Sequence, residues 1–224
     1  MKRLIEIACF NVEAALIAAK QGAHRIELCT NYALGGITPP IDIVQAVMQQ
    51  VNIPVHVMVR PRGGDFVYTA HEIHEMVNTI TSFKNLGVAG IVSGVLTKQR
   101  TIDLSALSLL LAACKGSHFT FHRAIDACEN TDESMAVLAA LGVTHVLTSG
   151  GQQTALEGAE KLAVWQKAVG HKLQIIAGGS IRASNLQTLM DTTNCFAFHS
   201  AAITDTSHLP NGSEILKMVQ LAQA

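Results

Sequence analysis

Short apolar runs recur along the chain, and each is followed by a stretch with the spacing of an amphipathic helix. Side chains alternate between two faces of a strand, whereas a helix repeats its faces every 3.6 residues, so the two patterns can be told apart. The alternation predicts strands at residues 4–9, 25–29, 55–60, 90–95, 119–123, 145–148, 173–177 and 196–200. The helical spacing predicts helices near residues 12–21, 40–50, 70–86, 104–114, 132–141, 155–169, 183–191 and 213–223.

Local signals support several of these helix boundaries. Thr69 and Thr154 are each followed three residues later by a glutamate, which is the spacing of a capping box. The pair Thr38-Pro39 places proline at the first position of a predicted helix. Glycines follow three predicted helix ends, at Gly22, Gly87 and Gly142.

The regular alternation of strands and helices predicts the fold class. Eight strand–helix units follow one another with no linker and no change of composition, which is typical of an α/β protein with a TIM (β/α)₈ barrel as a single domain over residues 1–224. The alternative is an open, doubly wound sheet. No G-x-G-x-x-G motif follows the first strand, and the units continue unbroken to the C-terminus, so we favour the barrel.

The third strand has the clearest division into two faces. Val55, Val57 and Val59 alternate with His56, Met58 and Arg60, and the strand ends in Pro-Arg-Gly-Gly-Asp at residues 61–65. Glycines at a strand end let the backbone approach a ligand closely. In a barrel, the polar face of such a strand points inward and its C-terminal end reaches the active-site mouth.

The same alternation, applied to each strand, predicts a polar barrel interior. Phe196 and Phe198 are expected to point outward, and Thr148 inward if Leu147 packs outward. Buried charges are costly unless they are paired, so the simplest network pairs Glu6 and Glu27 with Arg60 and Arg62. The residues expected to face inward are Glu6, Ala8, Glu27, Cys29, His56, Arg60, Arg62, Thr120, His122 and His199.

Position along the strands separates candidate functional residues from structural ones. Glu6 and His56 lie deep in their strands and fit a core ion-pair network. Asp126 could orient a histidine, bind a polar substrate or simply form a turn. Residues near the strand ends are the candidates for catalysis or binding, because barrel active sites lie there: Glu27, Arg60, Arg62, His122 and His199.

Two glycine-rich turns follow the sixth and seventh strands. They contain Gly150 and the pair Gly178-Gly179. In many barrels the loops after the last strands bind phosphate through backbone N–H groups at a helix start. The same glycines could instead serve a tight turn alone.

Composition narrows the function classes. Of 224 residues, 49% are hydrophobic and 15% are charged, with a net charge of −1, which fits a large core and gives no electrostatic basis for binding nucleic acid or an anionic membrane. No apolar run reaches the ~18 residues of a membrane span, and the N-terminus does not resemble a signal peptide. Five irregularly spaced cysteines fit free thiols in a reducing cytoplasm.

Five segments of the chain resemble the CutC copper homeostasis family, a family of cytoplasmic TIM barrels. They follow one another in order along nearly the whole chain, and the Pro-Arg-Gly-Gly-Asp-Phe segment is the most specific. Compared with many members of that family, the chain has a short segment, residues 201–213, after its last strand. The segments are Glu27-Leu28-Cys29, residues 35–39, residues 60–66, residues 121–124 and residues 147–150.

The resemblance implies copper as a ligand. Cys9 and Cys29, at the ends of adjacent strands, would then bind it, because thiolates suit Cu(I), with Met58 and the histidines as further donors. The alternation places Cys29 inward but gives Cys9 the outward parity of Ile5 and Ile7. No C-x-x-C motif is present.

Two functions from different classes follow. The first is a role in copper homeostasis with binding of a copper ion. The second is an enzyme acting on a small anionic ligand, a carboxylate or a phosphate, by isomerisation, aldol-type cleavage or hydrolysis; Arg60 and Arg62 would hold the anion and His122 or His199 would transfer protons. No lysine lies clearly at a strand end, which argues against Schiff-base chemistry and so against an aldolase. A third alternative is that the barrel serves as a binding or scaffolding module. The chain could also form a homo-oligomer.

Overall fold

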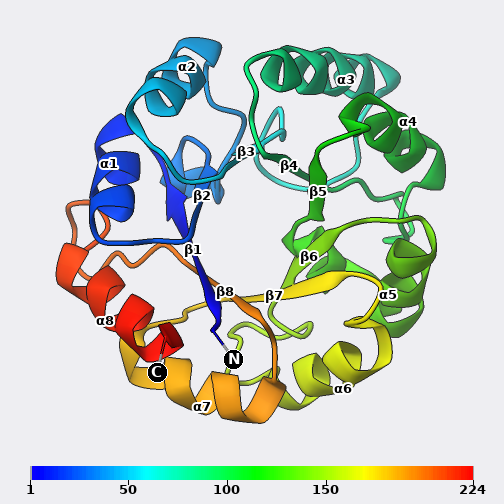
Figure 1. Ribbon diagram of the computed structural model, residues 1–224. Helices are drawn as coiled ribbons and strands as arrows, with labels where there is room; N and C mark the ends of the chain where they lie inside the picture. The colour runs from blue at the N-terminus through cyan, green and yellow to red at the C-terminus, as the bar shows by residue number, and fades with distance from the viewer. Residues whose placement is uncertain (1, 224) are drawn as a thin grey trace.

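The structure, a computed structural model that describes residues 2–223, contains a closed barrel of eight parallel strands (Figure 1). Neighbours in sequence are neighbours in the barrel, and β8 closes it by pairing with β1. The strands are β1 (Leu4–Cys9), β2 (Arg25–Leu28), β3 (Val55–Met58), β4 (Gly90–Ser93), β5 (His118–Phe121), β6 (His145–Thr148), β7 (Gln174–Gly178) and β8 (Ala197–Ser200).

Each strand is followed by an α-helix, and the helices form a ring around the barrel (Figure 1). The predicted TIM barrel is therefore confirmed. The helices are α1 (Val12–Lys20), α2 (Ile41–Gln50), α3 (Ala70–Asn85), α4 (Leu104–Cys114), α5 (Thr131–Ala140), α6 (Ala159–Val169), α7 (Ala183–Thr193) and α8 (Gly212–Gln223). Within residues 2–223, no helix is both long and apolar enough to span a bilayer.

The apolar core has two parts, as strand alternation requires. Outward-facing residues such as Ile5, Ile7 and Phe198 belong to one large cluster between the barrel and the helices. Inside the barrel the apolar residues form two small clusters, one around Met58 and one around Ile176. The rest of the interior is polar, so its free energy depends on pairing of charges more than on apolar contact.

Most predicted helix ends are confirmed, and two differ. Thr69 forms the predicted capping box with Glu72. Thr154 forms the same reciprocal bonds with Glu157, but they close a turn, and α6 begins only at Ala159. The prediction for Pro39 was wrong because α2 begins at Ile41 with Pro40 as its N-cap. Gly22, Gly87 and Gly142 all adopt positive φ, 83°, 80° and 77°, as expected after a helix end.

The facing of strand β6 differs from the prediction. Leu147 packs inside the barrel against Ile176, whereas Val146 belongs to the outer cluster. Thr148 therefore does not point into the barrel. Phe196 also packs against the inner cluster, ahead of β8, instead of pointing outward. Both errors arose where consecutive apolar residues made the two faces indistinguishable.

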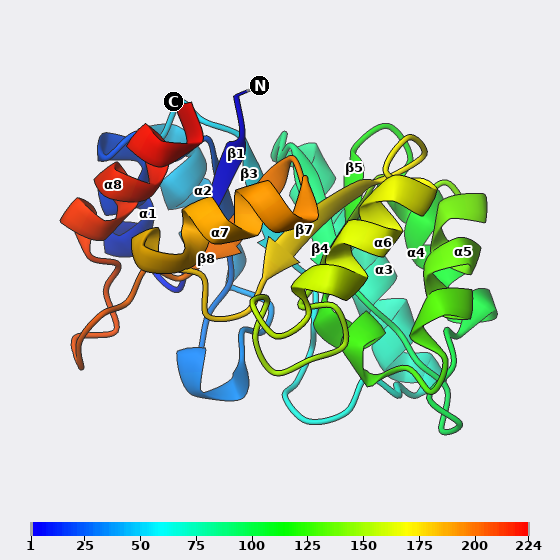
Figure 2. The same cartoon turned by 90° about the horizontal axis from the view of Figure 1, so that it is seen from below.

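The two ends of the barrel differ in their loops. The chain termini lie at the end where the strands begin, which faces the viewer in Figure 1 and is uppermost in Figure 2. The opposite end carries two short 3₁₀ helices, η1 (Tyr32–Leu34) and η2 (Arg123–Ala127), in the loops after β2 and β5. These loops surround the C-terminal mouth, where active sites of this fold lie.

Candidate functional site at the C-terminal mouth

A cavity of about 240 Å³ opens at the C-terminal mouth. Four of the predicted site residues line it together, although they come from four different strands or strand ends: Glu27, Arg60, His122 and His199. Cys29 and Met58 line it as well. The cavity is the size of a small metabolite, and its wall combines apolar surface with a few charged groups, which is typical of ligand sites.

Arg60 contributes a buried positive charge. Its side chain is 7% exposed, and its Nη atoms donate to the carbonyl oxygens of Leu34, Gly36 and Gly64 at 2.9 to 3.1 Å. Its Nε is buried without a partner, and the guanidinium lies 4.9 Å from the ring centre of Phe66. In the described part of the chain, no carboxylate forms an ion pair with it.

His122 stands beside this cation at the end of β5. Its Nδ1 accepts a hydrogen bond from the Ala124 backbone at 3.2 Å, and its Nε2 is buried without a partner. Burial and the charge of Arg60 lower the pKa of His122 to about 3, so the imidazole is neutral at physiological pH. Gly94 makes room for the ring, because a Cβ there would lie 2.6 Å from it.

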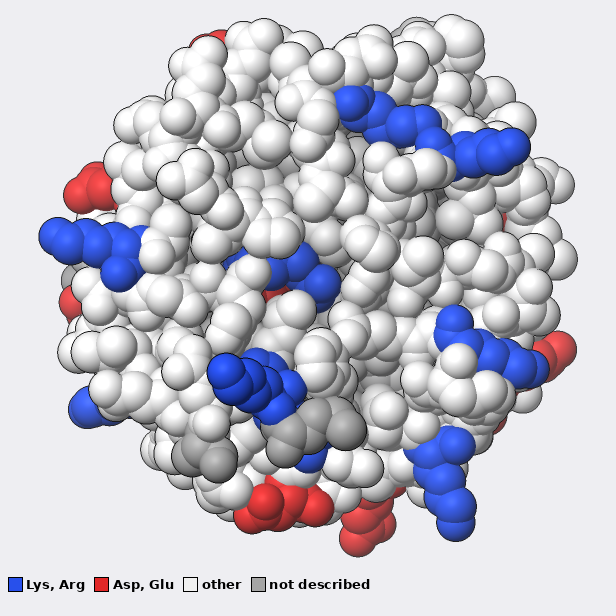
Figure 3. Space-filling model, viewed as in Figure 1, with Lys and Arg blue, Asp and Glu red and all other residues white. Residues whose placement is uncertain are grey.

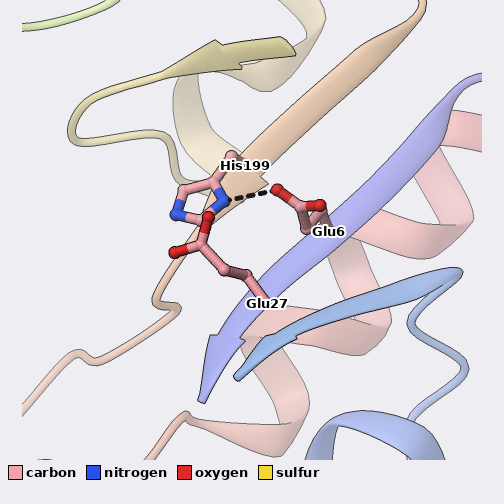
Figure 4. Close-up of side chains that lie close together, drawn as sticks. All are labelled: Glu6, Glu27 and His199. Atoms are coloured by element: carbon pink, nitrogen blue, oxygen red, sulfur yellow. Dashed lines mark hydrogen bonds and ion pairs between the residues drawn. The ribbon is translucent and has the colours of Figure 1, made fainter. Parts of the chain in front are cut away.

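His199 is held by a buried carboxylate. Its Nδ1 lies 2.7 Å from Oε1 of Glu6, which is 1% exposed, and the other oxygen of Glu6 accepts from Nε of Arg25 at 2.5 Å (Figure 4). Burial alone would raise the pKa of Glu6, but Arg25 and His199 hold it well below its usual range. Burial alone would lower the pKa of His199, but Glu27 and Glu6 raise it. The arrangement fixes the ring as a carboxylate fixes a catalytic histidine.

Glu27 is the second carboxylate of this group. It is 4% exposed, and its Oε2 is buried without a hydrogen-bond partner. Burial raises the pKa of Glu27 to about 7, and the negative charge of Glu6 adds to the effect. Ligand atoms of Glu6, Glu27 and His199 lie within 4.8 Å of one another, which is close enough to hold a metal ion (Figure 4). Both oxygens of Glu6 are already bonded to protein groups, and Glu27 and His199 are the two members of this trio that can exchange protons.

The predicted pairing of glutamates with arginines was wrong in both pairs. Glu6 pairs with Arg25 and His199, and the Arg60 side chain donates to carbonyl oxygens. Arg62 does not reach the interior: its side chain is 41% exposed and pairs with Asp65 and Glu72 outside the mouth. The reason lies in the break after Met58, where β3 ends and strand alternation no longer applies.

Two arginines near the site were missed by the sequence reasoning. Arg25 has the same strand parity as Glu27, so the alternation that found Glu27 also indicated Arg25. Arg123 lines the cavity from η2. Strand alternation gave no signal for it because it follows the end of β5, although it lies in the family-like segment 121–124.

Asp126 orders the loop after β6. It accepts hydrogen bonds from the Thr148 hydroxyl at 2.5 Å and from the backbone of Ser149 and Gly151 at 3.1 Å. It also accepts from Nε of Arg123 at 2.8 Å. Of the three roles expected for Asp126, the structure shows turn formation. Asp126 also holds the side chain of Arg123 at the mouth.

The glycine-rich turns pack against each other outside the cavity. A Cβ on Gly150 would meet the Gly158 carbonyl at 2.5 Å, and the Gly179 carbonyl accepts from the Ala155 backbone at 3.0 Å. At the start of α7, the Glu214 carboxylate already accepts from the Ala183 backbone. Close packing around these turns therefore explains why glycine is needed at positions 150, 178 and 179, without a bound anion.

The two cysteines implied as copper ligands lie on opposite sides of the barrel wall. Cys9 is 0% exposed within the outer cluster, whereas Cys29 lies inside with Met58. Burial raises the pKa of both thiols, so both are protonated at neutral pH. The two thiols do not form a joint site facing the cavity.

Comparison with known proteins identifies the family. A protein of Histophilus somni named as a CutC family protein is 39% identical over 219 residues, covering 98% of this chain and 90% of its own. A Salmonella enteritidis relative with the same family name is 42% identical over 188 residues, covering 84% and 75%. The crystal structure of CutC from Streptococcus agalactiae, named for copper homeostasis, superimposes with a TM-score of 0.85 at 31% identity, covering 90% of this chain and 100% of its own. The sequence model of the CutC family matches residues 3–204, and the chain belongs to this family.

Proposed function

We propose that the protein is an enzyme that binds a small anionic substrate, a carboxylate or a phosphate, at the C-terminal mouth and transfers protons on it. The observation that carries the proposal is Arg60, a cation buried in the wall of the cavity without a carboxylate partner. A buried charge without a counterion is costly even when carbonyl oxygens surround it. A bound anion would remove most of that cost, because Arg60 lines the cavity that would hold it.

The proton-transferring groups face the same cavity. His199 is oriented by Glu6 through Nδ1, which leaves Nε2 for exchange with a substrate. Glu27 has an unbonded oxygen beside it. A general acid or base has to lie within hydrogen-bond reach of the reacting atom, and both residues line the cavity that would hold that atom. His122, neutral and with a free Nε2, would act as a hydrogen-bond partner for a polar substrate group.

Thermal unfolding with paired ligands tests this proposal. Small carboxylates are compared with their neutral amides or methyl esters, and phosphate monoesters with their neutral dimethyl triesters. At 100 times Kd a ligand stabilises the native state by about 2.7 kcal/mol, so the melting temperature of a chain of this size should rise by about 5–10 °C. We expect anionic compounds alone to give the rise, in wild type and in the Arg62→Met control. Equal stabilisation by the neutral partners would refute an anion site.

Copper binding is a second candidate function, and the contact between Cys29 and Met58 favours it. Cys29 and Met58 pack together and both line the cavity, which offers two sulfur donors suited to Cu(I). Cys9 faces the other side of the wall and does not extend this pair. If copper binds at the mouth, Cys29 therefore contributes and Cys9 does not.

Anaerobic Cu(I) titration separates the two cysteines. In the copper account, wild type and Cys9→Ala bind one equivalent of Cu(I), and Cys29→Ala binds none. If Cys29→Ala binds as tightly as wild type, no copper site exists at this thiol. The matched Cys9→Ala variant removes the other buried thiol and so controls for a general effect on stability.

A further inference from the structure

Part of the wall of the mouth cavity is apolar and takes no part in the proposed proton transfer. Phe10, Cys29 and Met58 line the cavity and pack together in one of the small inner clusters. Tyr32 continues this surface toward solvent, and its ring centre lies 5.1 Å from that of Phe10 in an edge-on contact. These four residues form a continuous stretch of the lining, which we call the aromatic wall.

Tyr32 is held at the mouth by an ordered loop. The loop after β2 closes as a hairpin, in which the backbones of Thr30 and Ile37 exchange hydrogen bonds at 3.0 and 2.9 Å. Its tip is tied to the barrel by Arg60, which donates to the carbonyl oxygen of Leu34 at 2.9 Å. The Tyr32 ring is therefore in position before a ligand binds, so little conformational entropy is lost on binding.

The ring of Tyr32 still has surface that a ligand can cover. Tyr32 is 46% exposed, although its ring contacts Phe10 and lies 5.4 Å from the imidazole centre of His208. The end of the barrel where the strands begin, which faces the viewer in Figure 3, also has a groove, but polar side chains such as His118 and Gln166 make up most of its lining. A flat apolar ligand group therefore fits the mouth better than the opposite end.

The chemistry of the aromatic wall favours one kind of ligand group. Aromatic rings attract one another through edge-to-face and offset contacts, and the thioether of Met58 makes favourable contacts with ring edges. A sugar hydroxyl against Phe10 or Met58 would lose its hydrogen bonds to water and gain none. The charged groups of the cavity are needed elsewhere in the proposed function, Arg60 for the anion and His199 for proton transfer.

We infer that the substrate is an aromatic acid, a carboxylate or phosphate monoester whose aromatic ring packs on Phe10, Tyr32 and Met58 while its anionic group binds at Arg60. The inference rests on the proposed function, because Arg60 supplies the contact to the anion. Tyr32 is then the residue that sets specificity for the ring. Aliphatic and polyhydroxylated acids of the same charge gain less from the aromatic wall and bind more weakly.

Isothermal titration with acids of equal charge tests the inference. Phenylacetate is compared with cyclohexylacetate, whose ring is saturated, and with gluconate, a polyhydroxylated carboxylate. Phenyl phosphate is compared with glycerol phosphate in the same way. We expect phenylacetate to bind at least about 3-fold more tightly than cyclohexylacetate and at least about 10-fold more tightly than gluconate, and phenyl phosphate at least about 10-fold more tightly than glycerol phosphate.

Variants of the loop separate the ring from the rest of the site. Tyr32→Ala should weaken phenylacetate binding about 10-fold and change gluconate binding less than about 2-fold. Tyr32→Phe keeps the ring and should bind phenylacetate as wild type does. Leu34→Ala is the matched control, because Leu34 is a 45% exposed apolar residue of the same 3₁₀ helix that does not line the cavity. It should leave both affinities unchanged.

The outcomes distinguish this inference from the proposed function. Equal affinities for the three carboxylates and for the two phosphates, or unchanged phenylacetate binding in Tyr32→Ala, would show that the aromatic wall does not select the ligand, while the anion site stands. Neutral phenylacetamide that binds as tightly as phenylacetate, and is weakened equally by Tyr32→Ala, would refute the anion site and leave the aromatic wall. If neither phenylacetate nor phenyl phosphate binds, the inference is wrong, whatever the other acids do.

Discussion

Replacing Glu6 with glutamine is expected to lower the free energy of unfolding by about 3–5 kcal/mol. The change removes one negative charge inside the barrel and keeps the shape of the side chain. It leaves the Arg25 guanidinium, 4% exposed, without its counterion, and weakens the hydrogen bond to His199. Chemical denaturation of Glu6→Gln against wild type measures the loss.

A double variant shows whether the unpaired charge of Arg25 causes the loss of stability in Glu6→Gln. Arg25→Met in the Glu6→Gln background removes the unpaired cation, so this double variant should recover a large part of the lost stability. If Glu6→Gln unfolds within about 1 kcal/mol of wild type, the buried pair contributes little and the polar interior is not organised as described. If the double variant is less stable than the single one, packing and not charge dominates the site.

Replacing Arg60 with methionine is expected to weaken binding of any anionic ligand at the mouth by at least about 30-fold. Truncating one partner of a buried charge pair costs about 2–5 kcal/mol, because the ligand charge is then desolvated without compensation. Isothermal titration with the best ligand from the thermal screen gives the ratio of Kd values. Methionine retains much of the side-chain length against Phe66.

Arg62→Met is the control for this second prediction. Arg62 follows Arg60 by two residues but is 41% exposed and already paired with Asp65 and Glu72. Its loss should change the Kd less than about 3-fold, since exposed charges are screened by water and salt. Equal effects of the two substitutions would mean that the ligand responds to net charge alone and not to the buried guanidinium.

The fold and most of the mouth followed from strand alternation. The valines of β3 fixed which face of that strand points inward, and the same reasoning placed Glu27, His122 and His199. It failed at Leu147 because Val146 beside it is equally apolar, so the sequence held no contrast between the faces. The sequence pattern predicts which side chains point into the barrel only where polar and apolar residues alternate.

The partners inside the barrel could not be predicted in the same way. Glu6 meets His199 because β8 closes on β1, a contact between residues 193 positions apart. Arg62 was misplaced because the chain leaves the strand at Met58 and turns outward. Pairing depends on register and on loop paths, which a single sequence does not encode in its local pattern.

A crystal structure with a bound anionic ligand tests the central claim most directly. Soaking with a phosphate monoester or dicarboxylate that raises the melting temperature should place its anionic group within hydrogen-bond distance of Arg60. Its remaining atoms should then lie within reach of Glu27 and His199. An anion bound only at the N-terminal end, or a metal ion on Cys29 with no ligand at Arg60, would contradict the proposal that the mouth binds an anionic substrate.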